Sequence, residues 1–351
     1  RGLKQDMEFD TKILENNEVM IDNQFIGKIN GLKLELDLKK GALETDIKSL
    51  KKAARQTVGP ELEKRIQIII ETGLININDD FKIYWDRFAI ARLTSGKDYL
   101  NPNFELIVDD ILEQNQKQKL KNFIDKWLKN RINNVLKSLV DLRDLKEKNS
   151  SVKALAYQLY ENNGVLKREQ VSYYLKSLGQ NERKILRELG VKFGRYHIFL
   201  FKLIKPEPVS LRTLLWKNYH QKDFDLYPPT FGLNFLDNKN LKNKSFMLLC
   251  GFEKFDNFFI RIDILERLFM KIINLSTNEK KEIKMIPEML NLLGCNKDSF
   301  KKLLNSMGYK IREENNEVFF KYSSTKTNKK LFNKKNTKEN PFGVLKNLNF
   351  R

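Results

Sequence analysis

Alternation between hydrophobic and polar positions predicts short strands near the start of the chain. Leucine occupies every second position from residue 32 to residue 38, with mostly polar residues between. This two-residue period is typical of a strand that is buried on one face. A similar pattern over residues 19–29 surrounds an Asp22-Asn23 turn. The first segment is therefore expected to contain a β-hairpin.

After residue 38 the two-residue alternation of hydrophobic positions ends, and the following sequence predicts helices. Ala53 and Ala54 favour a helix over residues 43–57, and the Gly59-Pro60 pair is expected to end it. Proline suits the first turn of a helix, so a second helix is expected to begin at residue 60 and to run to about residue 71.

The strand pattern occurs a second time. Residues 19–29 match residues 83–93 without a gap, ending in Ile-Gly-Lys-Ile in the first copy and Ile-Ala-Arg-Leu in the second. Leu34–Asp37 also has a partner in Leu106–Asp109, with an insertion between. Helical sequence follows both copies. Self-similarity at a constant offset indicates a duplicated unit, so residues 1–150 are expected to form a duplicated β-hairpin-plus-helix domain.

A polar Lys-Asn-Ser-Ser sequence predicts the next boundary, where Ser150 or Ser151 suits a helix N-cap. The short helices expected after this boundary are spaced as in helix-turn-helix units, so residues 151–227 are expected to form a helix-turn-helix-like domain. Its three helices and one strand are expected at Val152–Asn162, Arg168–Leu178, Asn181–Leu189 and Tyr196–Leu200.

A less regular connector is indicated by four prolines, namely Pro206, Pro208, Pro228 and Pro229. Beyond it, Asn296 suits the N-cap of the third of three helices. Helix, helix, helix, hairpin is the winged-helix order, so residues 228–322 are expected to form a winged-helix-like domain. Its elements are expected at Ile262–Leu275, Pro287–Leu293, Lys297–Met307, Tyr309–Arg312 and Val318–Tyr322.

The end of the chain has a different composition. Residues 323–351 are rich in Lys and contain the single acid Glu339, and such a segment buries too little apolar surface to fold alone. A disordered basic tail is expected there. Within it, residues 341–348 carry apolar side chains at three-residue steps and are expected to dock a protein partner. The expected fold class is α+β, mostly helical, with a duplicated β-hairpin-plus-helix unit, two winged-helix-like helical units and this tail.

The charge of the chain bears on its partner. Lys and Arg number 65 against 45 Asp and Glu, which gives a net charge of +20, and the isoelectric point is near 9.6. Such an excess indicates an anionic partner, with nucleic acid first and an anionic membrane surface second. A biased genome is the competing explanation, because the chain is also rich in Asn and Ile.

The few cysteines and histidines bear on the compartment of the protein and on whether it can bind zinc. Cys250 and Cys295 form neither a CxxC motif nor a disulfide framework, which indicates a reducing compartment and an expected cytoplasmic location. His197 and His220 are too few for a zinc site. No run approaches the roughly 20 apolar residues of a membrane span, and we expect no membrane association. Because the chain begins at Arg1 without a signal-like segment, we expect a piece of a longer polypeptide.

Catalytic signatures are absent from the sequence. Gly27-Lys28 lacks the upstream glycine and the following Ser or Thr of a GxxxxGK[ST] phosphate loop. Neither GxSxG nor HExxH occurs, and Asp79-Asp80 is an isolated acidic pair. We therefore assign no catalytic residue, cofactor or metal ligand to this chain.

Basic and aromatic residues mark the first candidate binding site. Lys192, Arg195 and Tyr196 bring cations and an aromatic ring together after a helix, and such a group can neutralise phosphates and stack on unpaired bases. The competing interpretation is that Tyr196 packs inward as a strand residue. A second set lies on the third helix of the winged-helix order and would face a DNA groove: Lys297, Lys301 and Lys302.

Two other functions compete with an accessory nucleic-acid-binding role. The chain could be a free-standing winged-helix DNA-binding regulator that uses the second set of lysines. Against that reading, the expected wing is acidic at Glu313, Glu314 and Glu317. Winged-helix units also dock proteins, so a protein-docking scaffold is the other alternative.

Several segments, taken in order, carry a family resemblance: Gln24–Leu32, Ala154–Leu159, Leu186–Phe199, Leu203–Pro206, Leu211–Trp216, Ile262–Leu268 and Met289–Cys295. Together they resemble the region that follows the motor in large bacterial superfamily 2 DExH helicases, a family related to the mitochondrial RNA-degradosome helicase. The resemblance covers nearly the whole chain. The chain is poorer in Ala and Arg than that family and richer in Lys and Asn, which puts individual basic contacts in doubt.

The resemblance implies an accessory C-terminal region of an ATP-dependent helicase that grips single-stranded RNA or DNA leaving the motor, or docks partners. ATP and Mg would belong to two RecA-like motor domains in cis, which the resemblance places before this region. No nucleotide-binding residue is carried over to this chain.

Overall fold

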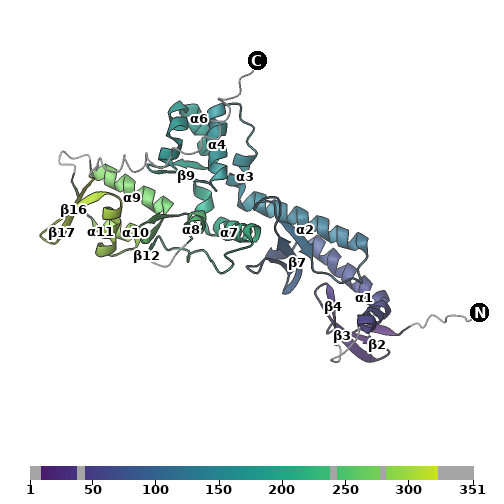
Figure 1. Cartoon of the computed structure of the whole chain (residues 1–351). Coiled ribbons are helices and arrows are strands. Elements are labelled where there is room, and N and C mark those ends of the chain that lie inside the picture. The colour runs from purple at the N-terminus through teal and green to yellow at the C-terminus, as the bar shows by residue number, and fades with distance from the viewer. Residues whose placement is uncertain (1–8, 38–43, 238–242, 277–281, 323–351) are drawn as a thin grey trace, which may run out of the picture. The chain divides into compact units, whose positions relative to one another are not determined.

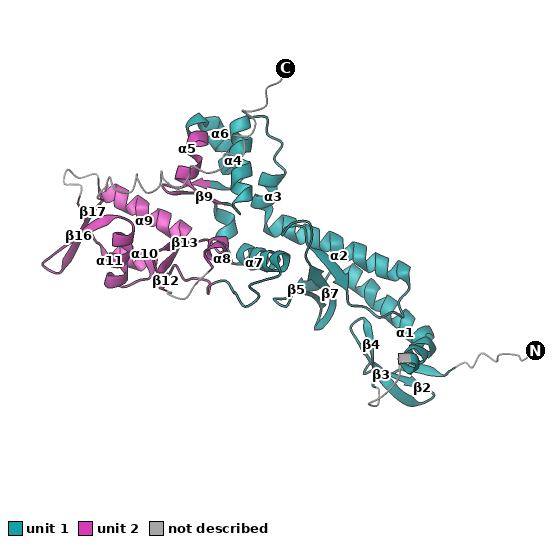
Figure 2. Ribbon diagram, in the orientation of Figure 1, with its two compact units in different colours: residues 1–164, 176–191, 200–228 teal, residues 165–175, 192–199, 229–351 magenta. Residues whose placement is uncertain are grey.

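The computed structural model describes residues 9–37, 44–237, 243–276 and 282–322. Within them the fold is α+β, as expected, with helices and several small antiparallel sheets (Figure 1). The chain divides into two compact units (Figure 2). The expected disordered tail and its docking segment at 341–348 lie outside the described residues. The ranges of the units are as follows: unit 1 contains 1–164, 176–191 and 200–228, and unit 2 contains 165–175, 192–199 and 229–351.

Unit 1 begins with two four-stranded antiparallel sheets, each with its strands in sequence order. A helix follows each sheet, α1 (Glu44–Thr72) after the first and α2 (Gln114–Val135) after the second. The strands of the first sheet are β1 (Thr11–Ile13), β2 (Glu18–Ile21), β3 (Gln24–Asn30) and β4 (Lys33–Leu36). Those of the second are β5 (Ile75–Ile77), β6 (Lys82–Trp85), β7 (Phe88–Thr94) and β8 (Asn103–Leu106).

The two sheets repeat one another in register as well as in order. Val19 pairs with Gly27 in the first, and Ile83 pairs with Ala91 in the second. The register then shifts at the next residue in both sheets, so the same irregularity occurs at the same place in β2 and β6. The gapless match between residues 19–29 and 83–93 is therefore a structural equivalence.

The fourth strand corrects one expectation. Leu36 pairs with Gly27, and Leu106 pairs with Ala91, so Leu36 is the equivalent of Leu106. The expected match of Leu34 with Leu106 is wrong by two residues. Side chains alternate with a period of two, so a shift by two residues leaves the same side chains on the same face. The hydrophobic pattern alone cannot detect such a shift.

A second correction concerns α1, which is one helix and not two. It continues through Pro60, although proline removes one backbone hydrogen bond and its ring crowds the preceding turn. Ala54 and Val58 before that proline and Leu62 after it follow four-residue steps along one helix face, and all three are fully buried. We infer that continuous burial of this face outweighs the local penalty of proline.

Asp109 joins the two sheets of unit 1. Its side chain is 2% exposed, accepts the amide of Leu34 at 3.0 Å and pairs with Lys51 of α1 at 3.1 Å. Its own amide donates to the carbonyl of Leu32. A buried carboxylate needs such partners because an unpaired buried charge is strongly unfavourable, so Asp109 has a structural role.

Gly27 offers a test of the duplication. A Cβ at this position would overlap the carbonyl oxygen of Glu35 on β4, whereas its equivalent Ala91 is buried with its methyl group accommodated. We expect Gly27→Ala to lower the free energy of unfolding by about 1–3 kcal/mol, the usual cost of overpacking. Urea unfolding followed by circular dichroism measures this change.

The matched control for Gly27→Ala is Ala91→Gly. That change removes a methyl group and adds backbone freedom, so we expect a cost of about 0.5–1 kcal/mol. A Gly27→Ala variant as stable as the parent chain would contradict the close approach of β3 and β4.

The rest of unit 1 is mainly helical and corrects two local expectations. The N-cap of α4 is Asn149, whose side chain accepts the amides of Ser151 and Val152, so neither Ser150 nor Ser151 is the cap. Pro206 begins a helix, α7, where the sequence indicated a connector, because proline suits a first turn. The elements are α3 (Lys137–Arg143), α4 (Ser150–Glu161), α6 (Gln180–Glu188), η2 (Phe201–Ile204) and α7 (Pro206–His220).

Unit 2 contains three small sheets and the helices between them. Its C-terminal helices and hairpin follow the expected order closely: α9 (Ile262–Leu275), α10 (Pro287–Leu293), α11 (Lys297–Ser306), β16 (Tyr309–Glu314) and β17 (Glu317–Tyr322). The earlier elements are β9 (Val165–Lys167), η1 (Arg168–Val171), β12 (Phe235–Asp237), α8 (Lys244–Leu249), β13 (Phe252–Phe255), β14 (Phe258–Arg261) and β15 (Ile283–Lys284). Three further elements cross the division between the units: α5 (Ser172–Ser177), β10 (Val191–Phe193) and β11 (His197–Leu200).

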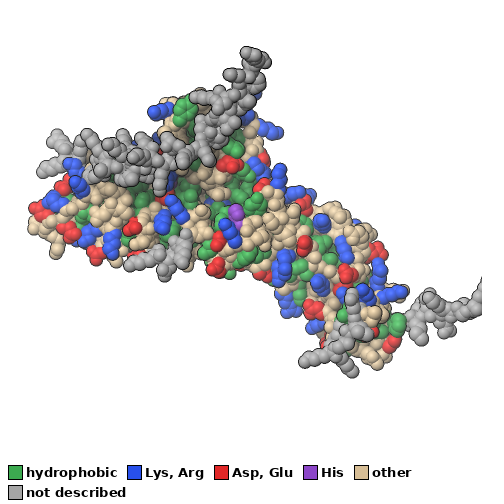
Figure 3. Space-filling view, viewed as in Figure 1, with side chains coloured by type: hydrophobic (Ala, Val, Ile, Leu, Met, Phe, Trp, Pro, Cys, Tyr) green, Lys and Arg blue, Asp and Glu red, His purple; other side chains and the backbone are tan. Residues whose placement is uncertain are grey.

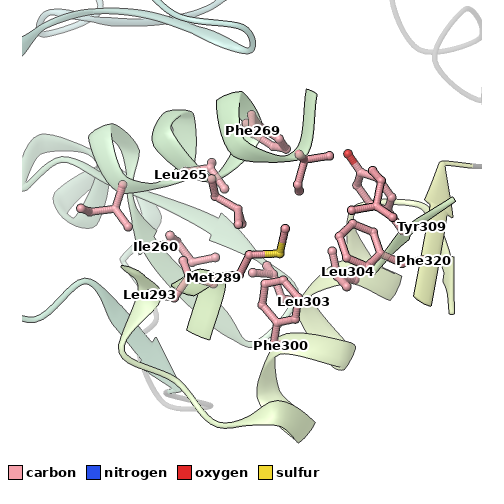
Figure 4. Close-up of a cluster of buried hydrophobic side chains, with 14 residues drawn as sticks. Ile260, Leu265, Phe269, Met289, Leu293, Phe300, Leu303, Leu304, Tyr309 and Phe320 are labelled. Atoms are coloured by element: carbon pink, nitrogen blue, oxygen red, sulfur yellow. The ribbon is translucent and has the colours of Figure 1, made fainter. Parts of the chain in front are cut away.

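One apolar cluster holds the C-terminal part of unit 2 together. In Figure 4, Met289 of α10 lies among side chains from α9 and α11, with Phe320 of the hairpin beside them. Met289, Phe300 and Phe320 are fully buried. Burial of this kind contributes roughly 25 cal/mol per Å² of apolar surface, so the cluster is the main stabilising element of these helices.

Candidate nucleic-acid interface

The first candidate site lies on a turn of unit 2 that a buried carboxylate holds in place. Glu266 of α9 accepts the backbone amide of Tyr196 at 3.0 Å, that of His197 at 2.8 Å, and that of Arg195 as well. A Cβ at residue 194 would overlap the Glu266 carboxyl group, so glycine is required there. The turn from Gly194 to His197 is therefore fixed by α9.

His197 ties the same carboxylate to a second one. Its ring is 3% exposed, with Nδ1 3.1 Å from Glu266 and Nε2 2.9 Å from Glu253 of β13. Lys167 of β9 lies 3.9 Å from Glu253. Burial by itself lowers the pKa of His197, but the hydrogen bonds and charges of Glu253 and Glu266 outweigh it and raise the pKa. The imidazolium form is thus favoured in the folded chain.

The Glu253–His197–Glu266 group is suited to structure and not to catalysis. Both ring nitrogens face carboxylates, so neither is open to a substrate or a metal ion. Burial raises the pKa of Glu253, yet its hydrogen bond to His197 and the charge of Lys167 bring the pKa below its ordinary value. The described residues contain no cluster of three potential metal ligands with suitable geometry.

Arg195 and Tyr196 project from the fixed turn. Tyr196 is 40% exposed, and its ring centroid lies 3.9 Å from that of Phe269 on α9. The guanidinium of Arg195, which is itself exposed, lies 6.0 Å from the Tyr196 ring centroid. Tyr196 therefore packs one side on the core and leaves the rest to solvent, which combines the two interpretations of this residue.

One further exposed tyrosine, Tyr322, extends this surface above the buried Tyr309, and the sequence singled out neither residue. Tyr309 and Tyr322 pair across the β16–β17 hairpin, with ring centroids 5.5 Å apart. Tyr309 is 7% exposed and belongs to the apolar cluster, whereas Tyr322 is 58% exposed. We call Arg195, Tyr196 and Tyr322 the aromatic platform.

Lys192, the third residue of the first candidate set, is exposed on β10. The second set occupies α11, where the acidic hairpin engages it. Lys301 pairs with Glu313 at 2.7 Å and with Asp298 at 3.3 Å. Lys297 donates to the carbonyl of Asn316 at 3.0 Å. Lys302 is exposed and has no ion pair among the residues that the structure describes. The hairpin thus engages two of the three lysines of α11, Lys301 through an ion pair and Lys297 through a backbone carbonyl.

Charge alone does not locate an interface. In Figure 3, Lys and Arg side chains are spread among acidic and apolar ones over the visible face, without one dominant basic patch. Neutralising a phosphate needs only a nearby cation, whereas holding an unpaired base also needs an exposed aromatic face. The aromatic platform combines both.

Within the described ranges, no helix is both long enough and apolar enough to cross a bilayer. The chain matches no family model, and no curated protein and no solved structure matches it.

Proposed function

We propose that this chain binds single-stranded nucleic acid through the aromatic platform of unit 2. The observation that carries the proposal is the exposed Tyr196 ring beside the Arg195 guanidinium, on a turn whose three amides are held by Glu266. Bases stack on such rings whatever their identity, so binding is tolerant of sequence.

The rigidity of the turn supports this function energetically. Ordering a flexible loop on binding reduces affinity, and a loop already held in its bound conformation avoids that loss. Glu266 and His197 provide this order before any ligand arrives. Arg195 neutralises a phosphate, and Tyr196 and Tyr322 offer rings to neighbouring bases.

The proposal extends to the larger protein on the family resemblance. The chain would be the accessory C-terminal region of an ATP-dependent, cytoplasmic DExH helicase, with ATP and Mg bound by motor domains in cis. Its duplicated sheet-and-helix unit would precede two winged-helix-like units. Residues 341–348 of the basic tail would dock a protein partner.

Salt titration tests the binding proposal. A fluorescently labelled single-stranded homopolymer is expected to bind the full chain with an affinity that falls linearly with salt on logarithmic axes, by a slope of about 0.7 per phosphate contact. Tyr196→Ala should weaken binding at least about fivefold, because each stacked base contributes about 1–3 kcal/mol. Arg195→Ala should also weaken binding and make the slope shallower by about one contact.

The controls separate stacking from general surface effects. Tyr196→Phe keeps the ring and should bind within about twofold of the parent chain. Tyr173→Ala removes a tyrosine that is 81% exposed in unit 2 and outside the platform, and it should leave the affinity unchanged. Absence of binding at low salt, or an affinity independent of salt, would contradict the proposed function.

A further inference from the structure

A cavity of about 300 Å³ opens in unit 1 beside α4. One wall is formed by Lys153, Ala156, Tyr157 and Tyr160 of α4. These residues follow the three- and four-residue steps that place side chains on a single helix face. The facing wall comes from Leu142 and Arg143 of α3 and from Leu145 just beyond it. The cavity therefore has an apolar floor and two aromatic side chains.

The charges of the cavity favour an anion. Its lining contains two cations, Lys153 and Arg143, and no carboxylate, while Asp144 pairs with Arg143 beside it and Asp98 acts on Tyr160 through its charge. Lys153 is exposed and forms no ion pair among the residues that the structure describes. Arg143 donates from Nε and Nη2 to the adjacent Asp144 at 2.9 and 3.1 Å, which fixes the plane of its guanidinium. Among the residues that the structure describes, no acceptor is bonded to its Nη1.

The tyrosines favour an occupant with a flat ring. Tyr157 is 59% exposed, and Tyr160, one helical turn further on, is partly buried. Burial raises the pKa of Tyr160, assisted by the charge of Asp98, so this hydroxyl stays protonated and able to donate. The volume is at the lower end for small-molecule pockets, about 300–1,000 Å³, which suits a single ring system.

We propose that this cavity is a second nucleic-acid site that holds one nucleotide of a single strand. The base lies against Tyr157 and Tyr160, and its phosphate contacts Lys153 and the Nη1 of Arg143. This inference rests on the proposed function and adds a binding site in unit 1. An acidic peptide fits less well, because Asp144 already occupies the bidentate edge of Arg143 on which a carboxylate pairs best.

Photo-crosslinking of the full chain to a single-stranded oligonucleotide carrying 5-iodouridine tests the site. Crosslinked peptides are mapped by mass spectrometry, and affinities are measured in parallel. We expect crosslinks at Tyr157 or Tyr160. Tyr157→Ala should weaken binding at least about fivefold, since it removes a stacking ring, whereas Tyr157→Phe should bind within about twofold. Lys153→Ala should lower the salt slope by about 0.7.

A lysine outside the cavity supplies the matched control. Lys129→Ala on α2 removes an exposed lysine that pairs with Asp125 at 2.7 Å, and it should leave slope and affinity unchanged.

Crosslinks confined to Tyr196 or Tyr322, with parent-like binding by Tyr157→Ala, would overturn this site and leave the proposed function standing. Crosslinks at Tyr157, with parent-like binding by Tyr196→Ala, would overturn the aromatic platform as the binding site and leave the cavity site standing. If no oligonucleotide binds, both fail. An acidic, Phe-containing peptide that needs Tyr157 while the oligonucleotide does not would assign the cavity to a protein partner and overturn the inference.

Discussion

Replacing Glu266 by alanine is expected to lower the free energy of unfolding of unit 2 by about 3–5 kcal/mol, the range for removing one partner of a buried ion pair. The Glu266 carboxylate is the acceptor for the amides of Arg195, Tyr196 and His197 and for the His197 ring. Without it, the three amides lose their acceptor and the buried imidazolium loses one of its two carboxylates, and each unsatisfied donor is itself unfavourable. Urea unfolding, followed by far-ultraviolet circular dichroism, measures the change.

The same variant should also bind nucleic acid more weakly, because the turn that presents the aromatic platform loses its anchor. Glu169→Gln is the control, since Glu169 is an exposed glutamate of unit 2 and surface substitutions usually change stability by less than about 0.5 kcal/mol. A Glu266→Ala chain with parent-like unfolding would show that the carboxylate does not hold the turn.

The stability of unit 2 is expected to decline as pH rises above about 6.5, the ordinary pKa of histidine. The pKa of His197 is raised in the folded chain because hydrogen bonds to Glu253 and Glu266 outweigh burial. The folded state then binds more protons than the unfolded state, so this contribution is complete below about 6.5 and is lost as pH rises through the folded pKa. Neutral imidazole can donate to only one of the two carboxylates, which leaves the other without a proton donor.

His197→Gln should therefore be less stable than the parent at pH 6, by about 3–5 kcal/mol, and should lack the decline above pH 6.5. Thermal unfolding across pH 5–9 measures both effects. At the acid end, the pKa of Glu253 is lowered, so its contribution is present above its ordinary pKa near 4.5 and is lost as pH falls through the folded pKa. Stability should be greatest between these two limits.

His220, at the end of α7 in unit 1, supplies an internal control of opposite sign. Burial and then Lys222 lower its pKa, so folded unit 1 binds fewer protons than the unfolded chain, and the stability of unit 1 rises with pH up to about 6.5. His220→Gln should remove that rise and leave the decline above pH 6.5 intact. A decline that survives in His197→Gln would mean that another group is responsible.

Local sequence signals predicted the C-terminal helices well. α9 and α10 have the expected bounds, and α11 ends one residue early. Pro287 stands in the first turn of α10, Gly294 adopts the left-handed conformation that ends it, and the Asn296 side chain accepts the Ser299 amide. Each of these devices acts within a few residues of the chain, so they can be recognised in the sequence.

The elements between residues 229 and 261 were not predicted, and the reason is their length. β12, α8, β13 and β14 each have between three and six residues, too few for a helical or strand period to develop. Phe258, Phe259 and Ile260 are consecutive and all buried. A short apolar run of this kind does not reveal whether it belongs to a strand or a helix.

Sequence alone determined the repeated strand pattern, the caps of the C-terminal helices, the basic charge, and Arg195 with Tyr196 as candidates. Only the tertiary structure decided that α1 continues through Pro60 and that Glu266, 70 residues after Tyr196, holds the binding turn. Caps and turns are set by neighbours along the chain, at roughly 1 kcal/mol each. Burial of a whole helix face, or pairing of a buried charge, involves several times that free energy and acts between distant residues, so it can override local preferences while leaving no local signal.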